Sequence, residues 1–170
     1  MSYFKLFFFL FLFQIGFSQQ NIFDISRKGS VEEVKEAMKQ NPDIINSLND
    51  EGYSPLILAS YRGNVSVVNF LIQNVKDING SGPMGTPLMA AVVKGNKEIV
   101  LALLENNADA NLSDANGTTA LIYAVQFKNV DIIKLLLSYK ADKSKIDDKG
   151  KTAFEYAVFS NNDEIINLFK

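Results

Sequence analysis

The stretch Thr86-Pro87-Leu88-Met89-Ala90-Ala91 decides the fold, because its pattern returns along the chain at a nearly constant step. Related segments open at Ser54, Thr119 and Thr152, so the four segments start 32, 33 and 33 residues apart. Each segment has an alanine five residues after its Ser or Thr, namely Ala59, Ala91, Ala124 and Ala157. A period of about 33 residues with this pattern is typical of a helical solenoid, a stack of similar helical units.

Each unit is predicted to form a helix, a tight turn, a second helix and an extended loop. The Ser or Thr suits the N-cap of the first helix, since its hydroxyl oxygen can accept a hydrogen bond from a free backbone N–H. Pro55 and Pro87 fall in the first turn, where no intrahelical N–H is needed. Gly63 and Gly95 are expected to end that helix in the left-handed conformation. Lys128 has the same register and should be strained there by about 1 kcal/mol.

Apolar pairs recur in the second half of each unit, for example Ile99-Val100 followed by Ala102-Leu103. Their i, i+3, i+4 spacing gives the second helix one apolar face. A single helix pair cannot bury that face, so neighbouring units must stack around a shared core. The expected core residues are Leu56, Ala59, Val68, Leu71, Leu88, Ala91, Val100, Leu103, Leu121, Ala124, Ile133 and Leu136. A polar residue also recurs at this period, as Asn46, Asn79, Asn111 and Ser144.

These segments resemble the ankyrin repeat, whose pattern is T-P-L-H-x-A with a period of 33 residues. The stretch from Asn107 to Asn111 is similar to the loop ending G-A-D-V-N of that family. The histidine of the pattern is absent, and its positions hold Ile57, Met89, Ile122 and Glu155. In the family that imidazole ties adjacent hairpin loops together, so its absence weakens the expectation of rigid loops but leaves the fold unchanged.

The resemblance implies an all-α ankyrin-repeat solenoid of about four to five repeats. We expect an N-terminal capping repeat over residues 19–48 and a C-terminal capping repeat over residues 147–170. Between them lie three repeats, over residues 49–81, 82–113 and 114–146. Polar residues near the C-terminus are expected to give that end a solvated face, as terminal solenoid repeats require.

The first 18 residues have the pattern of a secretory signal peptide. Lys5 precedes an apolar run from Leu6 to Phe13, and the small residues Gly16 and Ser18 stand before a cleavage site at Gln19. An uncleaved membrane anchor is the alternative reading. We therefore expect an exported protein, of bacterial origin by its composition, in the periplasm or, alternatively, in the extracellular medium.

Composition excludes several functions. Beyond residue 18 the chain keeps 16 basic and 19 acidic residues, a net charge of −3, which argues against a nucleic-acid partner. The sequence contains neither His nor Cys, so the usual nucleophile–base pairs and imidazole metal sites cannot form. We expect no enzyme activity, no cofactor, no bound metal and no small-molecule substrate.

Two motif-like stretches are better explained by the repeat. The segment from Gly80 to Gly85 spells G-x-G-x-x-G, but it follows a repeat loop rather than a buried strand, so it indicates a glycine-rich hairpin. Asp109, Asn111 and Ser113 alternate like the start of a calcium loop. However, Asp114 and Ala120 replace the glycine and glutamate that such a loop needs.

The remaining prediction is a protein-binding surface on the concave side of the solenoid, which the first helices and loop tips form in ankyrin-like repeats. The predicted partner-binding residues are Glu51, Tyr53, Tyr61, Arg62, Val93, Lys94, Asn116, Phe127 and Phe159. Tyr61, Val93, Phe127 and Phe159 would form an apolar stripe along it, unless their side chains pack between repeats. Our first hypothesis is a non-enzymatic interaction module. The alternative is an accessory, immunity or inhibitory subunit of an exported enzyme or toxin.

Overall fold

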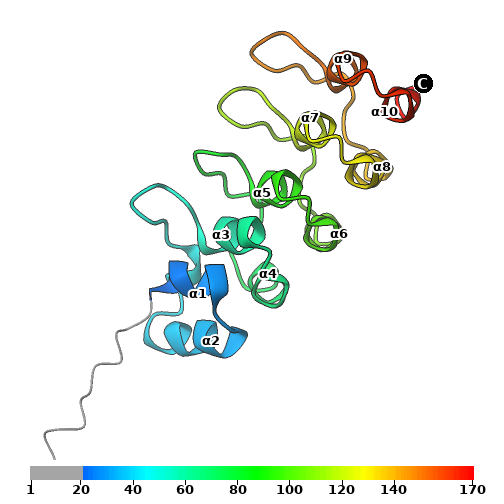
Figure 1. Ribbon diagram of the computed structural model, residues 1–170. Helices are drawn as coiled ribbons and strands as arrows, with labels where there is room; N and C mark the ends of the chain where they lie inside the picture. Colours follow the sequence, from blue (N-terminus) through cyan, green and yellow to red (C-terminus); the bar gives the residue numbers. More distant parts are fainter. Residues whose placement is uncertain (1–20) are drawn as a thin grey trace, which may run out of the picture.

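The computed structural model describes residues 21–170, and these residues form ten α-helices arranged as five stacked pairs (Figure 1). The first helices of the pairs are α1 (Ile22–Lys28), α3 (Pro55–Arg62), α5 (Pro87–Val93), α7 (Ala120–Gln126) and α9 (Ala153–Phe159). The second helices are α2 (Val31–Gln40), α4 (Val65–Ile72), α6 (Lys97–Glu105), α8 (Val130–Ser138) and α10 (Asp163–Asn167). A short 3₁₀ helix, η1 (Ile44–Asn46), follows α2. The signal peptide expected over residues 1–18 lies outside the described residues.

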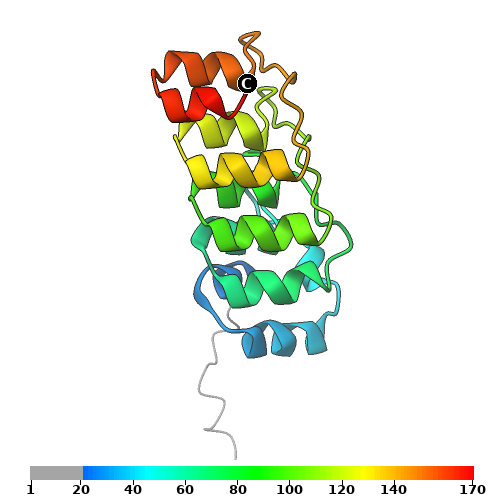
Figure 2. The same ribbon diagram turned by 90° about the vertical axis from the view of Figure 1, so that its right-hand side faces the viewer.

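The helices form two layers, one made of all the first helices and one made of all the second helices (Figures 1 and 2). Each first helix packs against the first helices before and after it, and the second helices do the same in their own layer. Four hairpin loops project from the first-helix layer, over residues 47–53, 80–85, 113–118 and 146–151. The described residues form only isolated β-bridges in these loops and no strand. The expected all-α solenoid is therefore confirmed.

The predicted Ser and Thr helix caps are confirmed in all four repeats that carry the pattern. The hydroxyl of Thr86 accepts a hydrogen bond from the backbone N–H of Met89 at 3.3 Å, and Ser54, Thr119 and Thr152 cap their helices in the same way. Gly63 and Lys128, which follow the first helices α3 and α7, both have the left-handed backbone conformation, with φ of 77° and 55°. The lysine thus holds a conformation that L-residues with a side chain adopt at a cost.

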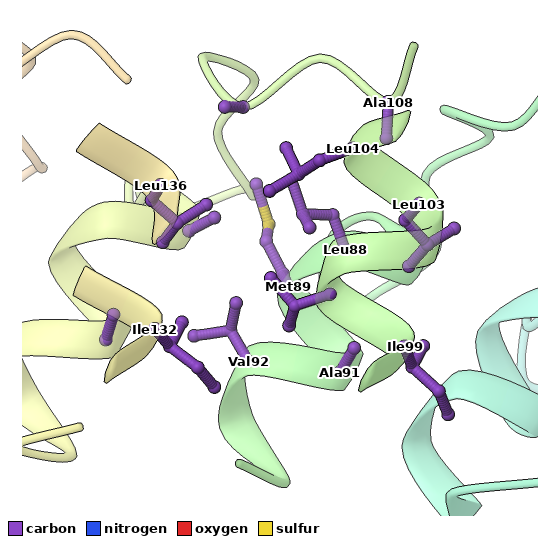
Figure 3. Close-up of a cluster of buried hydrophobic side chains, with 14 of the residues drawn as sticks. Leu88, Met89, Ala91, Val92, Ile99, Leu103, Leu104, Ala108, Ile132 and Leu136 are labelled. Carbon is purple, nitrogen blue, oxygen red and sulfur yellow. The ribbon is translucent and has the colours of Figure 1, made fainter. Parts of the chain in front are cut away.

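One continuous apolar core runs between the two layers. All twelve core residues predicted from the repeat register are buried, each with at most 1% of its surface exposed. Figure 3 shows the side chain of Val92 from one helix pair lying beside that of Ile132 from the next pair. The buried alanines Ala59, Ala91 and Ala124 take little space between successive first helices, which lets the repeats approach closely.

A ladder of asparagine side chains links each repeat to the next. The Oδ1 atom of Asn46 accepts from the backbone N–H of Lys76 at 2.9 Å. Asn79 and Asn111 accept in the same way from Asp109 at 2.9 Å and from Asp142 at 2.7 Å. Ser144, the last member of the series, instead donates to its neighbour Asp142. The recurring asparagine is explained by this contact, which needs a following repeat to supply the N–H.

The two ends of the stack differ. At the N-terminal end, Ser30 and Glu33 form a capping box at the start of α2. At the C-terminal end, the polar face expected from the sequence is incomplete, because Phe154 and Val158 of α9 have 41% and 49% of their surface exposed. The corresponding residues of earlier repeats are buried by the helix that packs against them.

Candidate protein-binding face

A groove of about 430 Å³ lies between the first helices and the hairpin loops, and residues of four successive repeats line it. Its lining is mainly aromatic and aliphatic. The lining residues are Arg27, Glu51, Tyr53, Ile57, Leu58, Tyr61, Arg62, Met84, Ala90, Val93, Tyr123 and Phe127. Sites of this volume, with apolar walls and a few polar groups, are common binding sites in proteins.

Six of the nine residues predicted from the sequence line this groove, namely Glu51, Tyr53, Tyr61, Arg62, Val93 and Phe127. They meet there because each lies at the C-terminal end of a first helix or in a hairpin loop, and the stack repeats both features side by side. Lys94 lies beside the groove, with its Nζ 5.0 Å from the centre of the Tyr61 ring.

The structure does not bring the other two predicted residues into the groove. Asn116 lies at the tip of the third hairpin loop, and Phe159 ends α9 in the last repeat. Phe159 is 70% exposed, and the Nζ atom of Lys151 lies over its ring, 4.3 Å from the ring centre. The ring therefore does not pack between repeats. The predicted apolar stripe is therefore continuous in the groove for Tyr61, Val93 and Phe127 only.

Half of the lining lies outside the nine residues predicted to bind the partner. Leu58, Ala90 and Tyr123 share one register, four residues after the N-cap, and lie one helical turn before the predicted positions. Residues separated by three or four positions share a helix face, so this spacing could have identified them. Arg27 was missed because the first helix pair lacks the repeat pattern that would align it with Tyr61.

Tyr123 is held in place by a carboxylate of the third hairpin loop. Its hydroxyl donates a hydrogen bond of 2.6 Å to Oδ2 of Asp114, and its ring stacks on Phe127 with 6.5 Å between the ring centres. The other oxygen of Asp114 accepts from the backbone N–H groups of Asn116 and Thr118, both at 2.9 Å. Burial and the bond to Asp114 together raise the pKa of Tyr123 to about 12.

The next repeat has the same arrangement. The Tyr156 hydroxyl donates to Asp147 at 2.5 Å, and Asp147 also accepts from the N–H groups of Lys149 and Lys151. Burial acts to raise the pKa of Asp147, but these hydrogen bonds outweigh it and leave the pKa below its ordinary value. The third and fourth hairpin loops are thus each fastened to the first helix of their own repeat.

The first two hairpin loops lack this fastening and are held by close packing instead. Asn49 and Gly82 occupy the register of the two aspartates, while Leu58 and Ala90 occupy that of the tyrosines. A Cβ atom on Gly82 would lie 3.0 Å from the carbonyl oxygen of Gly52 in the first hairpin loop. Gly82 also pairs with Gly85 across the second loop, so the hairpin reading of the G-x-G-x-x-G stretch is confirmed.

Over residues 21–170, no group of three or more Asp or Glu side chains is placed to hold a metal ion. The carboxylate of Asp109 accepts from the backbone N–H of Asn111 at 2.8 Å, which accounts for the calcium-like spacing by loop structure. In the same part of the chain, no helix combines the length and the hydropathy that a membrane crossing requires.

Comparison with known families identifies the repeat. The family described as "Ankyrin repeats (3 copies)" matches residues 22–114 and, in a second overlapping match, residues 88–170. Together the two matches span all ten helices. Among curated proteins, none matches the sequence significantly.

Proposed function

The chain belongs to the ankyrin-repeat family, and on that premise we propose that it binds a partner protein through the groove formed by its first two hairpin loops and its first four first helices. Ankyrin repeats generally mediate protein–protein interaction. The main support for this face as the binding surface is the apolar groove, in which Tyr61, Val93 and Phe127 are aligned across three repeats.

Physical chemistry favours this surface as an interface. Phe127 is 55% exposed although it is a large apolar residue, and it stacks on a Tyr123 ring that is held by Asp114. Aromatic and arginine side chains in such a position are the residues that most often dominate binding energy. A surface whose side chains are already fixed loses little conformational entropy when a partner binds.

The test is affinity purification of the tagged protein, with identification of what it retains, repeated with the double variant Tyr61→Ala/Phe127→Ala. We expect the double variant to lose the partner, with affinity reduced at least tenfold, because both substitutions remove apolar contact area. Tyr139→Ala is the matched control, because it removes an exposed tyrosine at the end of α8, in the other layer. Equal capture by the double variant and the unaltered protein would refute this face.

We also propose that the protein works outside the cytoplasm, in the periplasm or the medium. The support is the sequence of residues 1–18 alone. Mass spectrometry of the protein isolated from its native cells tests the proposal, since cleavage predicts an N-terminus at Gln19. A protein found in the cytoplasmic fraction with residues 1–18 intact would contradict it.

A further inference from the structure

We propose that the groove recognises an acidic segment of the partner protein. This segment places large apolar side chains in the groove and carboxylates along one edge of the groove. This inference rests on the proposed function and specifies the chemistry of the partner. Its basis is an arrangement of cationic side chains, here called the basic row: Lys28, Arg62, Lys94 and Lys128.

The basic row follows the C-terminal ends of the first helices. Lys28 and Arg62 are the last residues of α1 and α3, Lys94 directly follows α5, and Lys128 lies two residues beyond α7. All four side chains are exposed. The chain beyond residue 18 has a net charge of −3, so this row is a local reversal of its overall charge.

The four cations of the basic row have no acidic partner among residues 21–170, whereas several cations of the second-helix layer have one. Lys97 pairs with Asp131 at 3.4 Å and Lys134 pairs with Glu164 at 3.2 Å, each between neighbouring repeats. No such ion pair forms within residues 21–170 at Arg62 or Lys94. The contact of Lys94 is with the Tyr61 ring, which itself lines the groove.

Position at a helix end does not by itself identify a binding feature. Basic residues stabilise the C-terminal end of any helix, and Lys39 occupies the last turn of α2 in the other layer. Pairing separates the two cases. Lys39 pairs with Glu36 at 2.6 Å, whereas no cation of the basic row is paired with a carboxylate among residues 21–170, so the charge of the row remains available to a partner.

The opposite edge of the groove sets the orientation of the partner. Glu51 is the one carboxylate among the lining residues, and it lies at the tip of the first hairpin loop. Carboxylates of the partner would be repelled from this edge and attracted to the basic row. Neighbouring helices lie about 8–10 Å apart, so successive cations of the row are separated by about that distance. Two residues seven positions apart on a helix are separated by about 10 Å along its axis. Carboxylates with this spacing on a partner helix would therefore match successive cations of the row.

The experiment is selection of binding peptides from a random 16-residue display library against the protein produced from its full sequence. We expect the selected peptides to be enriched in Asp and Glu beside Leu, Phe or Tyr, and to lose binding to Tyr61→Ala/Phe127→Ala. The double variant Arg62→Glu/Lys94→Glu should weaken their binding at least tenfold. The charge-preserving variant Arg62→Lys/Lys94→Arg should bind as the unaltered protein does, and Glu51→Lys should bind equally well or more tightly.

The possible failures separate the two proposals. Two outcomes would overturn the proposal of an acidic partner while leaving the protein-binding groove in place. The selected peptides could depend on the groove without being enriched in Asp and Glu, or acidic peptides could bind Arg62→Glu/Lys94→Glu as tightly as they bind the unaltered protein. If no selected peptide depends on Tyr61 and Phe127, the groove itself is refuted. Thermal unfolding of each variant verifies that it is folded, which the exposure of Arg62 and Lys94 leads us to expect.

Discussion

The hydroxyl of Tyr123 in α7 donates a 2.6 Å hydrogen bond to the carboxylate of Asp114, nine residues earlier in the third hairpin loop. The bond fastens the loop to its helix and fixes the ring that forms the end of the groove. The ankyrin pattern uses a histidine to hold its hairpin loops, and this chain has none. In the third and fourth loops, a hydrogen bond between a tyrosine and an aspartate of the same repeat ties the loop to its first helix.

Tyr123→Phe is expected to change the stability of the protein at alkaline pH. The pKa of Tyr123 is raised to about 12, above the ordinary value of about 10. Its contribution to stability is therefore complete below pH 10 and is lost as the pH rises toward 12. Urea unfolding between pH 8 and 12 should show a steeper loss for the unaltered protein than for Tyr123→Phe. Tyr139→Phe serves as the control for removing a tyrosine, and equal slopes in all three proteins would contradict the prediction.

Leu103→Ala should lower the free energy of unfolding by about 2–5 kcal/mol, because it leaves a cavity in the core between the two layers. Leu103 is fully buried (Figure 3). Leu48→Ala removes the same atoms from a side chain that is 61% exposed, and its effect should stay within about 0.5 kcal/mol. Chemical denaturation of both variants measures the difference, and similar losses would place Leu103 outside the core.

Lys128→Gly should raise the free energy of unfolding by about 0.5–1 kcal/mol, since glycine adopts the φ of 55° found there without strain. Gly63→Ala is the reverse change at the same register. It should destabilise, because φ is 77° and the added Cβ would lie 3.3 Å from Nδ2 of Asn96. Shifts in melting temperature of opposite sign are expected. Shifts of the same sign would show that backbone strain does not control this position.

Ser60→Ala should stabilise the protein by about 1 kcal/mol. The hydroxyl of Ser60 is fully buried and has no hydrogen-bond partner within the described residues, so its removal relieves an uncompensated loss of solvation. Ser26 has the same register in the first pair, and there the hydroxyl donates to the carbonyl of Ile22 at 2.8 Å. Ser26→Ala should bring no such gain, and a comparable gain in both variants would trace the effect to helix propensity.

Asn111→Ala should destabilise by about 1 kcal/mol through loss of the hydrogen bond to the backbone N–H of Asp142 in the next repeat. Hydrogen exchange at that amide should accelerate at the same time. Ser144→Ala is the control, because Ser144 occupies the corresponding position in the last repeat and its hydroxyl donates only to its neighbour Asp142. This variant should leave the inter-repeat contacts intact. Unchanged exchange at Asp142 in Asn111→Ala would show that the ladder does not hold the repeats together.

The periodic features were predictable from the sequence because each depends on local geometry. The N-cap hydroxyl of Thr86, the left-handed Gly63 and the buried Leu103 follow from helix ends and helix faces, which a regular spacing reveals. The groove was only half predictable. Glu51 and Arg62 were identified from their place in the repeat, but Arg27 belongs to a helix pair without the repeat pattern.

The sequence by itself determined the period, the helix pairs, their caps and the shared core, because these depend on short-range backbone geometry and on apolar spacing within one repeat. The tertiary structure alone decided which side chains meet across repeats. It placed the Tyr123 hydroxyl on Asp114, excluded Phe159 from the groove and left Arg62 without a carboxylate among the described residues. These relationships depend on how far each repeat is displaced and turned relative to the last, and that is fixed by packing between side chains distant in the sequence.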